Sequence, residues 1–106
     1  MREQPLILIV EDNPASLEIM QVRLEASDYR VITATDGEEG LAEAQSSLPD
    51  LILLDVMMPK MDGLEVCRRL KNNDSLPFMP IIMVTAKTDT KDVIAGLEAG
   101  GDEYLT

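Results

Sequence analysis

The segment that most constrains the fold is a run of four aliphatic residues, Leu51-Ile-Leu-Leu54, that ends at Asp55. A short continuous apolar run is typical of a strand that is buried on both faces of a parallel sheet. Pro59 follows and cannot donate to a strand ladder, so the strand ends near Asp55. Ligands bind at the carboxyl ends of strands in such sheets, which makes Asp55 a candidate nucleophile or metal ligand. This segment alone supports about equally an Asp55 that only ends the strand or caps a turn.

The rest of the chain alternates between strand-like and helix-like patterns. Asn13-Pro14 and the Asp36/Glu39 pair have the form of helix starts, the second as a capping box. Apolar or β-branched runs predict strands at 6–10, 30–34, 51–55, 81–85 and 102–106. Apolar residues at helical spacing predict helices at 14–27, 37–48, 63–70 and 90–99. Strands that alternate with helices imply an α/β fold, a doubly wound parallel sheet with right-handed crossovers.

The polarity of the strands predicts their order in the sheet. The first, third and fourth strands are apolar on both faces and are interior, whereas 30–34 is more polar and belongs at an edge. The order 2-1-3-4-5 follows, a five-stranded flavodoxin-like sheet whose switch point lies between the first and third strands. Glu11 and Asp12 then lie on one side of the crevice and Asp55 on the other.

The length and the charge limit the classes of function. The 106 residues form a single domain, and a net charge of −11 disfavours direct binding of nucleic acid or anionic lipid. A basic protein partner or a divalent cation fits better. Cys67 is the only cysteine and the chain has no histidine, so neither an internal disulfide nor a Cys/His zinc site can form. We interpret Cys67 as a core residue of a reducing, cytoplasmic protein, because no signal peptide or membrane span is evident.

Three carboxylates at one crevice require an explanation. At about 4 Å and an effective dielectric constant near 20, each like-charged pair costs on the order of 4 kcal/mol. A hard cation removes this cost, and carboxylates are ligands that suit Mg²⁺. With Mg²⁺ bound, Asp55 could attack phosphorus and form an aspartyl phosphate, with the Thr85 hydroxyl near the phosphoryl oxygens.

Each of these residues also has an ordinary structural role. Asp12 or Asn13 could simply cap the first helix, Thr85 could be a strand-end residue, and Tyr104 could be an edge aromatic. The joint occurrence of acid, acid and hydroxyl after the first, third and fourth strands favours the functional interpretation.

The segments 6–13, 51–59 with 61–63, 81–86 and 101–106 together resemble the receiver domain of response regulators, the CheY-like superfamily of two-component signalling. The resemblance covers essentially the whole chain. It implies that Asp55 accepts a phosphoryl group from a histidine kinase or a histidine phosphotransfer protein. It also implies that Glu11, Asp12, Asp55 and the Met57 backbone carbonyl bind Mg²⁺, and that Thr85 and Tyr104 form the switch. The domain would then be a regulatory phosphoacceptor rather than an enzyme, acting on an output domain or effector, with homodimerisation left open.

The chain departs from the family pattern at its end. The family has a lysine after the last strand and then a fifth helix, whereas this sequence ends at Thr106. Lys87 lies after the fourth strand and is not assigned that role. We therefore expect residues 1–106 to be a C-terminally truncated receiver domain that lacks the fifth helix. One face of the sheet, beside the first helix, should then be uncovered, and competence for phosphorylation is open.

Three rival functions can be weighed against this hypothesis. A haloacid-dehalogenase-like phosphatase would need a second Asp two residues after Asp55, where this chain has Met57. A flavodoxin-like cofactor binder would need a phosphate-binding loop after the first strand, where Glu11 and Asp12 would repel phosphate. A receiver-like interaction module that is never phosphorylated is the third rival, and only experiment separates it from the phosphorelay function.

Overall fold

The computed structural model describes residues 4–55, 63–84 and 103–105. The strands in these ranges form one parallel sheet in the order β2-β1-β3-β4-β5. Their bounds are β1 Leu6–Val10, β2 Arg30–Ala34, β3 Leu51–Asp55, β4 Ile81–Val84 and β5 Glu103–Leu105. The predicted class, a parallel α/β sheet of the flavodoxin-like type, is confirmed.

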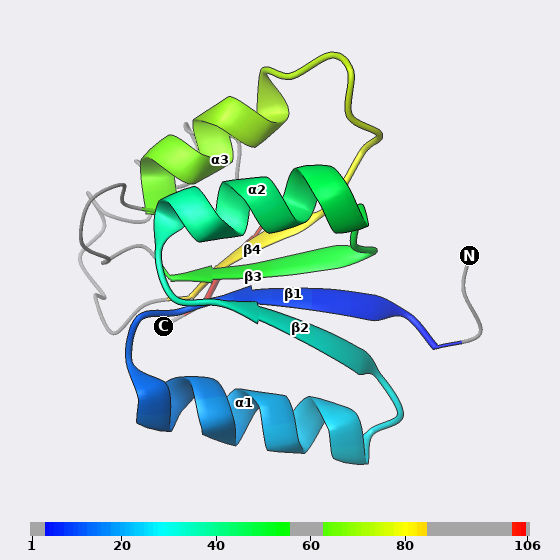
Figure 1. Ribbon diagram of the computed structural model, residues 1–106, viewed down its shortest axis with the longest axis vertical. Coiled ribbons are helices and arrows are strands. Elements are labelled where there is room, and N and C mark those ends of the chain that lie inside the picture. The colour runs from blue at the N-terminus through cyan, green and yellow to red at the C-terminus, as the bar shows by residue number, and fades with distance from the viewer. Residues whose placement is uncertain (1–3, 56–62, 85–102, 106) are drawn as a thin grey trace.

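Helices lie on both faces of this sheet (Figure 1). Within the described ranges they are α1 Pro14–Ala26, α2 Gly37–Ser47 and α3 Gly63–Lys71. One face carries α1 and the other carries α2 and α3. None of these helices has the length and hydropathy that crossing a membrane requires. The helix predicted at 90–99 lies outside the described residues.

The predicted helix starts are confirmed. The Asn13 side chain accepts hydrogen bonds from the backbone N–H groups of Ala15 and Ser16, at 3.0 and 3.1 Å. At the start of α2, the Asp36 side chain accepts the N–H of Glu39 at 2.8 Å. These side chains satisfy donors that have no partner inside the helix, and so they fix where α1 and α2 begin.

The main core lies between the sheet and the α2/α3 layer. Its members are the buried apolar residues Leu8, Val10, Ala34, Ala44, Ile52, Leu54, Val66, Cys67, Leu70, Met79, Ile81 and Met83. Cys67 is fully buried, which confirms its predicted place in the core. Gly40 lets α2 approach the sheet closely, because a Cβ at this position would lie 2.8 Å from both γ-carbons of Val10.

The opposite face of the sheet is less well covered. All five residues of β1 are buried, but burial alternates along β3, where Leu51 and Leu53 are only half-buried. Ile82 of β4 is also half-buried. The prediction that β3 is buried on both faces is therefore wrong. The reason is that α1 packs against β1 and β2 and does not extend over β3.

Candidate metal centre

The candidate site lies at the carboxyl ends of β1 and β3. These strands are parallel neighbours in which Val10 is opposite Leu54, so the residues that follow come to the same edge of the sheet. Asp55 is the last residue of β3. The Glu11 N–H donates to the Ala34 carbonyl at 3.0 Å, which continues the pairing of β1 with β2 one residue beyond the strand. The backbone that carries Glu11 is thus held by the sheet on the β2 side.

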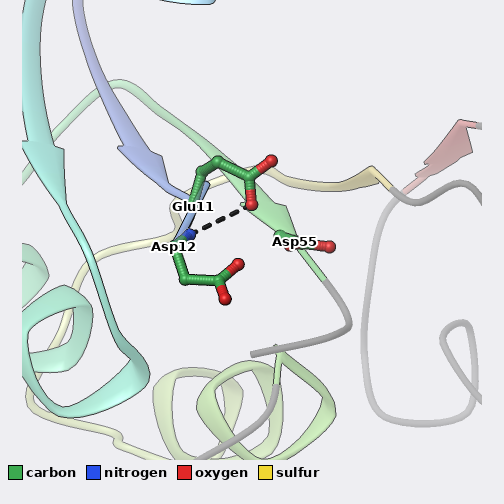
Figure 2. A group of neighbouring side chains, drawn as sticks. All are labelled: Glu11, Asp12 and Asp55. Atoms are coloured by element: carbon green, nitrogen blue, oxygen red, sulfur yellow. Dashed lines mark hydrogen bonds between the residues drawn. The ribbon is translucent and has the colours of Figure 1, made fainter. Parts of the chain in front are cut away.

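The topology brings together the three carboxylates that the sequence singled out. One carboxylate oxygen from each of Glu11, Asp12 and Asp55 lies within 4.8 Å of the others. Figure 2 shows the three side chains extending from the ends of β1 and β3. Glu11 and Asp55 are half-buried, and Asp12 is exposed. Among the described residues, no further His, Cys, Asp or Glu joins this cluster.

The surroundings of Glu11 favour the protonated form of its carboxyl. Its pKa is raised from 4.5 to about 8, first by partial burial, then by its hydrogen bond with Asp55 and by the negative charges of Asp55 and Asp12. At neutral pH without a cation, Glu11 therefore holds a proton. Its Oε2 atom also accepts the backbone N–H of Asp12 at 3.1 Å (Figure 2). This last contact could not be predicted from the sequence, because it depends on the path of the chain directly after β1.

The chemistry of the donor set fits a hard divalent cation. The cluster offers carboxylate oxygens only, and such ligands select Mg²⁺, Ca²⁺ or Mn²⁺ over softer metals. The three acids are close enough for one ion to contact more than one of them. A cation there would also replace the proton on Glu11 and remove the repulsion among the acids.

The remaining predicted site residues are placed only in part. Met57, whose backbone carbonyl was the fourth predicted ligand, and Thr85 lie outside the described residues. Tyr104 lies in β5, with its backbone opposite Met83 of β4. The structure thus brings together Glu11, Asp12 and Asp55, and the roles of all six residues stay predictions.

The comparisons with known proteins show the family to which this chain belongs. The model of the family "Response regulator receiver domain" matches residues 7–106, so the chain belongs to that family. The chain is 49% identical over 100 residues to the alkaline phosphatase synthesis transcriptional regulatory protein PhoP of Bacillus subtilis, covering 94% of this chain and 41% of PhoP. It is 46% identical over 100 residues to response regulator PleD of Caulobacter vibrioides, covering 94% of this chain and 22% of PleD. The chain therefore spans less than half the length of these curated relatives.

Solved structures show the same similarity. Chemotaxis protein CheY4 of Vibrio cholerae superposes with a TM-score of 0.90 at 32% identity, covering 97% of this chain and 86% of that one. A CheY-like receiver domain protein of Methanospirillum hungatei gives a TM-score of 0.88 at 33% identity, covering 97% and 81%. Receiver domains are regulatory phosphoacceptors of two-component systems and bind Mg²⁺ at an acidic pocket. Response regulators receive phosphate from histidine kinases and act on output domains.

Proposed function

We propose that this chain is a phosphorelay receiver in which Asp55 accepts a phosphoryl group from a phosphohistidine donor. The donor is a histidine kinase or a histidine phosphotransfer protein. The observation that supports this proposal is the meeting of three carboxylates within 4.8 Å at the ends of β1 and β3. Mg²⁺ would be held there by Glu11, Asp12 and Asp55, together with the backbone carbonyl of Met57.

The proposed reaction forms one bond and breaks one. A carboxylate oxygen of Asp55 forms a bond to phosphorus while the N–P bond of the donor breaks, and its electron pair returns to the imidazole of the donor. A bound Mg²⁺ supplies electrostatic stabilisation of the phosphoryl oxygens. Glu11 and Asp12 contribute by holding that charge beside Asp55. The half-buried position of Asp55 leaves it open to a donor that approaches from the edge of the sheet.

The proposed output is a shift between two conformations. Thr85 would bond the phosphoryl group, and Tyr104 at the outer strand would rotate to bury its ring, which changes the surface offered to an output domain or effector. The domain promotes only its own phosphorylation and dephosphorylation and is not an enzyme for other substrates. It binds neither nucleic acid nor a membrane directly, and it works in the cytoplasm. We also propose that residues 1–106 make up one receiver domain with the five-stranded sheet of the family.

Intact-mass measurement tests this function directly. The chain is incubated with Mg²⁺ and a small phosphodonor such as acetyl phosphate or phosphoramidate. We expect a mass gain of one phosphoryl group, lost on addition of EDTA and absent in Asp55→Asn. Asp50→Asn is the matched control, because it removes a carboxylate from the other end of β3, and it should still gain the phosphoryl group.

Two results would contradict the proposal. A mass gain that persists in Asp55→Asn would place the phosphoryl group elsewhere. No gain in the wild-type chain, with no Mg²⁺ bound, would favour the alternative of a receiver-like interaction module that is not phosphorylated.

A further inference from the structure

A second feature of the molecule is a cavity of about 210 Å³ at the connection between α3 and β4. It is lined by Leu70, Lys71, Asn73, Asp74, Leu76, Pro77, Phe78, Met79 and Ile81. Ile81 begins β4, whereas Val84, at the other end of this strand, is opposite Asp55. At about 3.3 Å per residue, the two ends are roughly 10 Å apart. The cavity is therefore separate from the acidic cluster.

The rim of this cavity holds an exposed aromatic ring in place. Phe78 is 75% exposed, the largest exposed fraction among the large apolar residues described. The Lys71 ammonium lies 4.5 Å from the centroid of the Phe78 ring and donates to the Met79 carbonyl at 3.2 Å. The Asn73 side chain stabilises the turn that follows α3, because it accepts the Ser75 N–H at 3.0 Å. An apolar group that is fixed in advance loses less entropy when a partner binds.

The segment that forms this cavity differs in charge from residues 4–55. Residues 63–83 contain three cations against two acids, whereas residues 4–55 contain two cations against eleven acids. Arg69 is paired with Glu65 at 3.1 Å. Arg68 is exposed and lies three residues before Lys71, on the same side of α3. Cations in a last turn also suit the helix dipole, but that role does not account for the exposed ring beside them.

We propose that the α3–β4 surface, defined as Arg68, Lys71, Phe78 and the lining of the cavity, binds a short acidic peptide segment of another protein. One bulky apolar side chain of the peptide enters the cavity beside Phe78, and acidic residues next to it face Arg68 and Lys71. The space is sufficient, since a cavity of about 150 Å³ already holds a benzene ring. Asp74 lines the same cavity, so the carboxylates of the peptide lie on the α3 side and its N–H groups face Asp74.

The net charge decides between a peptide and larger partners. A second copy of the chain carries a net charge of −11 itself, and an anionic membrane contacts a larger area than a peptide does, so both bring more negative charge close to the acids of this chain. A short peptide meets only the charges within about 8 Å, the screening length at physiological salt. Among the described ranges 4–55, 63–84 and 103–105, the segment 63–84 is the one in which cations outnumber acids, and this favours a negative segment at the α3–β4 surface.

Nuclear magnetic resonance titration of the ¹⁵N-labelled chain tests this proposal. The probe is an acetylated, amidated peptide of glutamates around a single phenylalanine. We expect saturable shifts of the amide signals from residues 68–81. Phe78→Ala and Arg68→Glu should each weaken binding by at least about tenfold, as loss of an anchoring contact does. Both side chains are exposed, so the dispersed spectrum of the folded chain should be kept.

Matched controls separate this surface from general charge and apolar effects. Arg30→Glu makes the same charge change on the β2 edge, and Ile19→Ala trims an exposed apolar residue on α1. Both variants should bind the probe within about twofold of the wild type, as surface changes away from the contact do. A probe with serine in place of phenylalanine should bind at least about tenfold more weakly.

Several outcomes would overturn the proposal. One is the absence of saturable shifts at millimolar probe, and another is equal binding by Phe78→Ala. Self-association through Phe78 without any probe, seen by analytical ultracentrifugation, would assign the surface to a second copy. Binding of phosphatidylglycerol vesicles that is lost in Phe78→Ala would assign it to a membrane.

Discussion

Two aspartates stand at the two ends of β3, and their surroundings differ. Asp50 precedes the strand, and its Oδ2 atom accepts the Leu6 N–H at 2.8 Å, while its own N–H donates to the Leu6 carbonyl at 2.8 Å. Asp55 ends the strand within 4.8 Å of oxygens from Glu11 and Asp12. The Asp50 carboxylate accepts a hydrogen bond from a backbone N–H, whereas the Asp55 carboxylate lies close to two other carboxylates.

This is the difference expected between an acid that stabilises the fold and an acid that binds a cation. A carboxylate that accepts a backbone N–H joins the starts of β1 and β3 and stabilises the sheet. Ionised carboxylates that face one another destabilise the fold until a proton or a cation binds, and with a cation the stability rises with its concentration. We therefore expect the acid at the amino end of β3 to stabilise the fold and the acids at its carboxyl end to bind a cation.

The largest effect should come from the structural end. Asp50→Ala leaves the N–H of the buried Leu6 without its acceptor, and hydrogen bonds to charged groups contribute about 1.5–3 kcal/mol. We expect the free energy of unfolding in urea to fall by about 2–3 kcal/mol. Glu18→Ala, an exposed acid on α1, is the control and should stay within about 0.5 kcal/mol. If Asp50→Ala is as stable as Glu18→Ala, the structural role assigned to Asp50 is wrong.

A second change tests the packing of α2 against β1, the strand that leads into Glu11 and Asp12. Gly40→Ala places a Cβ 2.8 Å from both γ-carbons of Val10, the residue before Glu11. Overpacking costs about 1–3 kcal/mol, and the better helix propensity of alanine returns up to about 1 kcal/mol. We expect a net loss of about 1–2 kcal/mol in urea unfolding. Val10→Ala in the same chain should relieve the clash, so additive losses in the double variant would contradict this account.

At the carboxyl end of β3, replacing the acid should raise the free energy of unfolding of the metal-free chain rather than lower it. Above about pH 8, where Glu11 is ionised as well, Asp55→Asn removes one negative charge from the cluster, so the metal-free chain should become more stable by up to about 1 kcal/mol. With Mg²⁺ the wild type should gain stability and Asp55→Asn should gain less, measured by urea unfolding with EDTA or with Mg²⁺. Asp50→Asn should show no metal-free gain. A loss of stability in metal-free Asp55→Asn would mean that this acid, too, is structural.

The sequence predicted the functional acids better than the structural one. Glu11, Asp12 and Asp55 follow apolar runs, and the rule that parallel strands present their carboxyl ends at one edge is enough to place them together. Asp50 carries no such sign, because its partner Leu6 is 44 residues away and only the register of β1 against β3 brings them together. The half-burial of Leu53 was missed for a similar reason, since it depends on how far α1 extends across the sheet.

A further effect should be the pH dependence of the metal-free chain, which follows from the raised pKa of the half-buried Glu11. The folded state raises the pKa of the Glu11 carboxyl from 4.5 to about 8, so the folded chain holds this proton more tightly than the unfolded chain does. The stabilisation is complete below about pH 4.5 and is lost as the pH rises to about 8.

Urea midpoints measured in EDTA across this range should therefore fall with rising pH in the wild type and fall less in Glu11→Gln. Because a cation competes with the proton on Glu11, the affinity for Mg²⁺ should rise over the same range and binding should release protons. Calorimetric titration in buffers of different ionisation enthalpy measures that release. A wild-type midpoint that rises toward pH 8, or an unchanged slope in Glu11→Gln, would show that Glu11 does not hold the proton and that the repulsion at the carboxyl end is relieved by another group.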